Sequence, residues 1–175
     1  MLILCLIMFP MLSALVIFSL GGRCRTVLSW GPAMAAAAEF ALSAFLLLRP
    51  QTLMLPAVLS GSLTFAADGF RVAYGLIASL LWLGSTLFSR EYFLHEPEHL
   101  RSYWAFVFLT LGAVQGLFLS ADYMTAFCFF EMLSLCSFPW VMHERTAQAI
   151  RAGCTYLAVS VIGGLILDYI RAKRS

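Results

Sequence analysis

Glu131 is the side chain with the clearest potential for chemistry, because its ionisable group lies inside a long apolar run. The residues around it, Phe127-Cys128-Phe129-Phe130-Glu131-Met132-Leu133-Ser134, contain no other charge. Glu131 follows Asp122 by nine residues. In a helix that begins near Asp122, this separation is about 13 Å at roughly 1.5 Å per residue. The carboxyl is therefore expected close to the centre of a hydrocarbon layer about 30 Å thick.

A carboxyl at that depth costs roughly 2.5–3.5 kcal/mol on insertion scales unless it faces protein or water. Desolvation favours the protonated form, and a nearby cation favours the ionised form. A carboxyl balanced between these influences can take up and release a proton. Cys128 and Ser134 flank Glu131 by three residues on either side and offer only weak or neutral hydrogen bonds. We interpret Glu131 as a proton relay. A neutral glutamic acid that joins two helices by a hydrogen bond is the alternative.

Glu39 is a secondary candidate near the middle of another apolar segment. Ala33, Ala37 and Ala41 form a stripe of small residues at four-residue spacing, which permits close contact with a neighbouring helix. Ser43, one turn further on, is placed to share the proton of Glu39. For this carboxyl a structural role is slightly favoured over a relay.

The remaining acidic and histidine side chains have simpler explanations. Asp68 and Asp122 lie at expected helix starts, where a carboxylate caps the helix. Asp168 is spaced to pair with Arg171 at the membrane surface. The stretch His95-Glu96-Pro97-Glu98-His99 contains metal-ligand types, but its proline disrupts helical pairing of the histidines and no third cluster completes a site. We therefore predict no metal.

The composition indicates a membrane protein. Apolar residue classes make up 62% of the 175 residues and charged residues 11%, and the mean hydropathy is +0.90. A soluble domain needs more charge to cover its surface. Basic clusters with interleaved aromatic residues are missing from the sequence, which argues against nucleic acid as a partner. The sequence also lacks CxxC pairs, glycine-rich phosphate loops and cofactor fingerprints, so we expect no cofactor and no redox or hydrolytic chemistry in this chain.

The apolar segments predict an all-α, polytopic fold. A bilayer span needs roughly 20 apolar residues, and the sequence offers about six such segments within a single transmembrane domain, residues 1–175. Their expected ranges are 2–20, 30–48, 70–89, 102–119, 122–142 and 152–170. The intervening stretch 51–69 contains Pro56, Gly61 and Asp68, and we interpret it as a re-entrant or surface loop.

Three stretches resemble the antiporter-like subunits of respiratory complex I, Mrp antiporters and membrane-bound hydrogenases. The first is residues 116–135, in which Ser120-Ala121-Asp122 breaks two apolar helices and Phe130-Glu131-Met132 follows. The second is Asp68-Gly69-Phe70, similar to the family's Asp-Gly pair. The third is residues 149–156, similar to its Ala-x-x-Tyr-Phe stretch. The resemblance covers most of the chain after about Asp68, and before that only hydropathy agrees. The whole chain is similar to a short version of such a subunit, covering about its first six helices.

The resemblance implies an all-helical fold with inverted repeats of five helices. It also implies that Glu131 is a proton-pathway residue. The family's glutamate pairs with a lysine on the next, broken helix, whereas the only lysine of this sequence is Lys173, close to its last residue. We therefore expect another membrane subunit to supply the transmembrane lysine that faces Glu131.

These features predict a multi-pass subunit of a redox-driven, ion-translocating complex in the cell inner membrane, surrounded by lipid and other membrane subunits. The complex would resemble complex I or a membrane-bound hydrogenase, and the ion is H⁺ or Na⁺. Two alternatives stay open: a structural membrane subunit in which Glu131 conducts nothing, and a small transporter formed by self-association.

Overall fold

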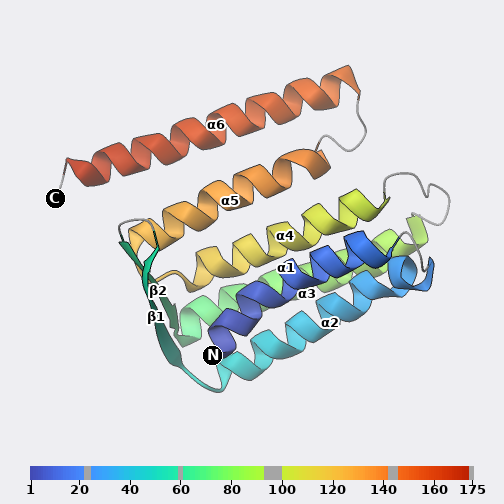
Figure 1. The fold of residues 1–175 in the computed structure, drawn as a ribbon, viewed down its shortest axis with the longest axis horizontal. Coiled ribbons are helices and arrows are strands. Elements are labelled where there is room, and N and C mark those ends of the chain that lie inside the picture. Colours follow the sequence, from blue (N-terminus) through green and yellow to red (C-terminus); the bar gives the residue numbers. More distant parts are fainter. Residues whose placement is uncertain (22–24, 59–60, 93–99, 142–145, 174–175) are drawn as a thin grey trace.

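The helices of the chain run side by side with a β-hairpin at one end of the array (Figure 1). The structure, a computed structural model, describes residues 1–175 except 22–24, 59–60, 93–99, 142–145 and 174–175. Its helices are α1 (Leu2–Leu20), α2 (Arg25–Leu47), α3 (Gly69–Tyr92), α4 (Leu100–Leu119), α5 (Tyr123–Val141) and α6 (Ala147–Ala172). The strands are β1 (Gln51–Val58) and β2 (Gly61–Ala67).

Five of the described helices are long and apolar enough to cross a membrane, which confirms the polytopic, all-helical prediction. The apolar stretches of α1, α2, α3, α4 and α6 are 19 to 21 residues long, and α5 contributes a shorter one, Tyr123–Pro139. Helices suit this environment because each satisfies its own backbone hydrogen bonds, for which hydrocarbon offers no substitute.

The helix bounds follow the predicted spans most closely where the apolar run is uninterrupted. Helix α1 covers the predicted residues, whereas α2 begins at Arg25 and α6 at Ala147, in each case five residues before the start predicted from the sequence. Hydropathy locates the part of a helix that suits hydrocarbon, but helical hydrogen bonding continues through polar residues beyond it.

Helices α1 to α4 form a four-helix bundle, and α5 and α6 extend from one side of it. Helix α4 packs against α1, α3 and α5, and α6 packs against α5 (Figure 1). Close packing of α1 on α4 depends on Gly112, where a Cβ would lie 2.7 Å from Met11 Cγ and 3.0 Å from the Ile7 carbonyl oxygen. Small residues have this role in membranes, where helix association relies on packing contacts.

The bundle interior contains two separate apolar clusters. One includes Ala14, Ala36 and Leu111, and the other includes Leu46 and Leu119. The second cluster lies toward the hairpin, because it also contains side chains of β2. The helix segments between the two clusters contain polar side chains, which are described below.

The hairpin corrects the interpretation of residues 51–69 as a re-entrant or surface loop. Strands β1 and β2 pair antiparallel, with Gln51 opposite Ala67 and Leu53 opposite Phe65, and the register shifts between Leu55 and Val58. Phe65 and Ala67 belong to the second apolar cluster. The two-residue alternation of β2 buries one face of the hairpin against the end of the bundle.

The hairpin also fixes the break between α4 and α5. Phe65 forms a bridge with Ser120, and the Ala121 backbone N–H donates to the Thr64 carbonyl oxygen at 2.8 Å. Polar backbone groups that neither helix can satisfy at this break are thus paired with the edge of β2.

Asp122 caps α5, as the sequence predicted. Its Oδ1 accepts a hydrogen bond from the Thr125 backbone N–H at 2.7 Å, and its Oδ2 accepts one from Thr125 Oγ1 at 2.8 Å. Oδ2 also accepts hydrogen bonds from the Thr64 hydroxyl and from the Thr64 backbone N–H, the latter at 3.2 Å. One carboxylate therefore joins β2 to the first turn of the helix that carries Glu131.

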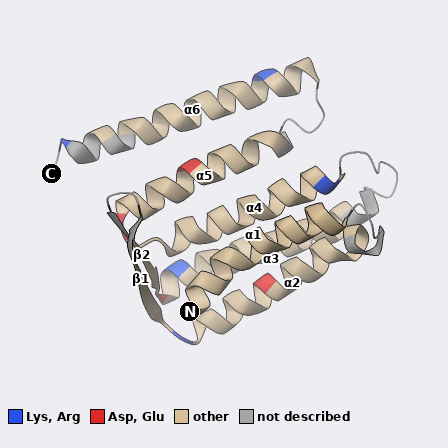
Figure 2. Cartoon of the chain, viewed as in Figure 1, with Lys and Arg blue, Asp and Glu red and all other residues tan. Residues whose placement is uncertain are grey.

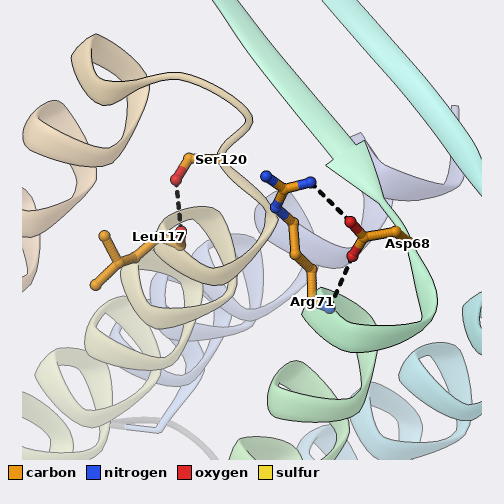
Figure 3. Close-up of polar contacts among 4 residues, drawn as sticks. All are labelled: Asp68, Arg71, Leu117 and Ser120. Atoms are coloured by element: carbon orange, nitrogen blue, oxygen red, sulfur yellow. Dashed lines mark hydrogen bonds and ion pairs between the residues drawn. The ribbon is translucent and has the colours of Figure 1, made fainter.

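Asp68 caps α3 in the same way (Figure 3). Its Oδ1 accepts from the Arg71 backbone N–H at 2.8 Å, and its Oδ2 pairs with Arg71 Nη1 at 2.9 Å. Ser120, in the break between α4 and α5, donates its hydroxyl to the Leu117 carbonyl oxygen at 2.6 Å (Figure 3). The capping prediction is thus confirmed for both aspartates.

We expect the Asp122 cap to make stability depend on pH in the acid range. Burial alone would raise the pKa of Asp122, but the hydrogen bonds from Thr64 and Thr125 outweigh it and lower the pKa from 3.8 to about 2. A lowered carboxyl pKa stabilises the fold above the unfolded-state value. The contribution is complete above pH 3.8 and is lost as the pH falls toward about 2.

The measurement is thermal unfolding of the detergent-solubilised chain across this pH range, beside the variant Asp122→Asn. Asparagine keeps a cap oxygen but has no proton to titrate, so its profile should be flatter between pH 3.8 and about 2. Identical slopes for the two proteins would contradict the assignment.

Candidate functional site

Glu131 lies on the side of α5 that packs against α6. Gly164, on the facing turn of α6, is buried, and a Cβ there would overlap Glu131 Oε1 and lie 3.2 Å from Phe127 Cε2. Only a residue without a side chain lets the carboxyl reach this depth of the helix interface. Glu131 Oε1 is thus enclosed between α5 and the backbone of α6, while the residue as a whole is partly exposed.

One oxygen of this carboxyl has no partner in the described part of the chain. Glu131 Oε1 is buried and makes no hydrogen bond to any described residue. Ser134, a proposed neutral partner, donates to the Phe130 carbonyl oxygen at 3.0 Å, and Cys128 is exposed. A buried oxygen without a partner costs roughly 1–3 kcal/mol. A proton, a cation or a water molecule beside Glu131 Oε1 would remove this cost.

A hydrogen bond two turns along fixes how α5 and α6 align. The hydroxyls of Ser137 and Tyr156 lie 2.9 Å apart. Tyr156 belongs to the stretch that carries part of the family resemblance, and its role here was not predicted from its spacing. A tyrosine early in one apolar helix and a serine late in the preceding one are the signal for such a contact.

The outer surface of α6 is apolar. Its exposed large hydrophobic side chains are Ile150, Tyr156, Val159, Ile162, Leu165, Ile166 and Tyr169, and exposed Gln148, Arg151 and Thr155 make only its first turns more polar. Among the packing contacts of the chain, α6 is held mainly by α5. This flank is therefore suited to lipid or to helices of another subunit.

Glu39 is completely buried in α2, and neither carboxyl oxygen has a hydrogen-bond partner among the described residues. Ser43 Oγ, expected to share its proton, is likewise buried and makes no hydrogen bond there. The predicted alanine stripe is wrong as a contact surface within the chain, because Ala37 and Ala41 are exposed. The inward face of α2 is the face that buries the Glu39 carboxyl, and Ala37 and Ala41 do not lie on this face.

Glu39 and Glu131 form two separate sites. Acidic positions lie midway along α2 and α5, on different sides of α4, while the basic positions drawn lie near helix ends (Figure 2). The described cations near these ends are Arg49, Arg71, Arg101, Arg151 and Lys173. Neither glutamate therefore has a described cation at its own depth.

Other predicted features are outside the described part of the structure. The His95–His99 stretch and the side chains of Asp168 and Arg171 are not described. Within the described residues, no group of three or more histidine, cysteine or acidic side chains is arranged to hold a metal ion.

Fold and site together define a class: a multi-pass helical membrane protein with a buried carboxyl midway along α2 and a partly buried one midway along α5. Over 101 residues, or 57% of its length, the chain is 31% identical to the Na⁺/H⁺ antiporter subunit A1 of Staphylococcus aureus. Over 107 residues, or 61% of its length, it is 23% identical to the antiporter subunit mnhA2 of Staphylococcus epidermidis. The matched regions are 12% and 13% of those relatives' lengths.

The fold is also that of a chain in an archaeal respiratory membrane complex, the membrane-bound sulfane sulfur reductase. The match has a TM-score of 0.80 and 15% sequence identity, and it covers 93% of this chain and 34% of that one. No protein-family model matches the chain. The comparisons confirm the resemblance to antiporter-like membrane subunits, and the location in a bacterial or archaeal cell membrane.

The contact between Gly164 and Glu131 leads to a prediction about the position of the carboxyl. In Gly164→Ala the new methyl group should push the carboxyl end of Glu131 out of the interface. Because this end of the side chain can rotate, the loss of stability should stay below about 1 kcal/mol. Labelling of Glu131 by a lipid-soluble carbodiimide, measured by mass spectrometry, should increase.

Gly163→Ala is the matched control, because a Cβ at this neighbouring position has no atom within 4 Å. Its labelling should equal that of the unmodified chain. Equal labelling of both variants would show that the carboxyl does not lie against Gly164.

Proposed function

We propose that this chain is a membrane subunit of a redox-driven, ion-translocating complex, and that Glu131 forms part of its proton or sodium pathway. The observation that carries the proposal is the carboxyl oxygen of Glu131, buried against Gly164 and without a partner in the described chain. The antiporter subunits and the respiratory complex to which the chain is similar support the choice of an ion-translocating machine.

The chemistry is a change of protonation at Glu131. In an apolar surround the neutral acid is the favoured form, whereas a cation brought close to the carboxyl favours the ionised form. A charge that approaches and withdraws would thus load and unload the site, provided that its interaction with Glu131 differs between the two states. The side chain itself needs no large movement.

The cation is proposed to come from outside this chain's described helices. The described basic residues lie near helix ends, so a transmembrane lysine of a neighbouring membrane subunit is the expected partner. The apolar outer surface of α6, with exposed Val159, Ile162 and Ile166, is suited to packing against such a subunit. Redox chemistry would take place in other subunits and act on Glu131 through displaced charge.

We predict that Glu131→Gln leaves assembly intact but lowers ion pumping. Glutamine keeps the shape of the side chain and removes the proton that can be exchanged. A positioned proton-transfer group typically contributes about 10²–10⁴-fold, so pumping per assembled complex should fall at least about tenfold. The assay is redox-driven ion uptake by proteoliposomes that contain the complex co-purifying with this chain.

Asp68→Asn is the control, because it neutralises an exposed carboxylate while asparagine still caps α3. It should assemble and pump normally. Normal pumping by assembled Glu131→Gln complexes would overturn the relay and favour a structural subunit. A chain that purifies only with copies of itself would favour a self-associating transporter.

A further inference from the structure

Fully buried polar side chains lie on the inward faces of α2, α3 and α4 in the α1–α4 bundle. Glu39 and Ser43 in α2, Ser79 in α3 and Gln115 in α4 are all 0% exposed. Gln115 Nε2 donates to the Gly75 carbonyl oxygen at 3.0 Å, which ties α4 to α3. We call Glu39, Ser43, Ser79 and Gln115 the polar layer.

The α2 members of the polar layer lie between the two apolar clusters of the bundle. Along α2, Ala36 belongs to one cluster and Leu46 to the other. Glu39 and Ser43 occupy the same inward face between them, since residues four apart in a helix lie one above the other.

The same order recurs along α4 and α1. In α4, Gln115 lies between Leu111 of one cluster and Leu119 of the other. In α1, buried Pro10 lies between Ile7 and Ala14, which belong to different clusters. Proline has no N–H, so the carbonyl oxygen four residues before it loses its helical donor at this level. Apolar packing is thus interrupted by polar atoms in several helices at once.

Most oxygens of this layer lack partners within the described residues. Both carboxyl oxygens of Glu39, Ser43 Oγ and Gln115 Oε1 are buried without a hydrogen bond. Ser79 differs, because its hydroxyl donates to the Leu76 carbonyl oxygen at 2.9 Å. Unsatisfied buried polar atoms in a native interior call for a specific explanation.

Ion pairing with a described residue does not provide this explanation. The arginines of the bundle whose side chains are described are at helix ends: Arg49 follows α2, Arg71 is in the first turn of α3 and Arg101 in the first turn of α4. Arg71 is paired with Asp68, and Arg49 lies over the Phe45 ring at 5.5 Å. An ionised Glu39 would thus be a buried charge without compensation.

We propose that the polar layer is a proton-binding site, in which Glu39 carries a proton and water molecules bridge its carboxyl to Ser43 and Gln115. A neutral carboxyl, a hydroxyl and an amide oxygen offer the mixed donors and acceptors that a buried water needs for its usual two to four hydrogen bonds. This site lies inside the bundle, on α2 and α4, apart from Glu131 on α5. It goes beyond the proposed function and does not depend on it.

Infrared spectroscopy of the full chain in lipid nanodiscs tests the proposal through the carbonyl stretch of protonated carboxyl groups. We expect a component that persists in Glu131→Gln and disappears in Glu39→Gln. It should shift when H₂O is replaced by D₂O, because water reaches the site. A purely structural glutamic acid sealed among helices would show no such exchange.

Ser43→Ala keeps Glu39 in place and provides a second readout that does not depend on folding of Glu39→Gln. Removing one hydroxyl from the site should move the frequency of the Glu39 component without abolishing it. The proposal is overturned if Glu39→Gln retains the component, or if Ser43→Ala leaves its frequency and its deuterium shift unchanged. Loss of the component on adding Na⁺ at constant pH would also overturn it, since the carboxyl would then be an ionised cation ligand.

Discussion

Hydrocarbon provides no hydrogen-bond partner, and this single constraint accounts for most of the architecture. It confines the membrane-spanning backbone to helices. It also makes a buried carboxyl costly unless a proton, a cation or a hydrogen-bond partner stabilises it. The non-helical backbone is placed accordingly: the hairpin lies at the end of the bundle, and the α4–α5 break pairs with β2 through Ala121 and Ser120. The position of Glu131 follows from this break, because Asp122 fixes where α5 begins.

The two mid-helix glutamates meet the constraint in different surroundings. Glu39 is enclosed by the four-helix bundle, together with other polar side chains. Glu131 is on the flank of the array, where a glycine of α6 makes room for its carboxyl. Glu131 is partly exposed at the α5–α6 flank, whereas Glu39 has no exposed surface. This difference in exposure is the physical reason to propose ion translocation for Glu131 and an internal proton site for Glu39.

The sequence predicted the features that depend on local residues, and it missed those that depend on contacts between distant segments. Long apolar runs were enough to predict helices, and Asp68 and Asp122 were predictable as caps because capping is local. The hairpin was missed because Pro56 and Gly61 suggest a loop. The alternation of buried and exposed residues that ends in Phe65 and Ala67 is short, and it indicates a strand only once the bundle that buries one face is known. The inward face of α2 was misjudged because spacing of alanines was weighed without the cost of leaving Glu39 in lipid. The pairing of Glu131 with Gly164 needs the relative position of two helices, which no local pattern contains.

The most direct test of the central claim is a structure of the complex purified from native membranes, with attention to the surroundings of Glu131 Oε1. We expect a lysine of another membrane subunit, or a water-filled path toward one, within hydrogen-bond reach of this oxygen beside α6. A sealed apolar surround of lipid or side chains at this position would contradict it, because the carboxyl could then neither receive nor release an ion.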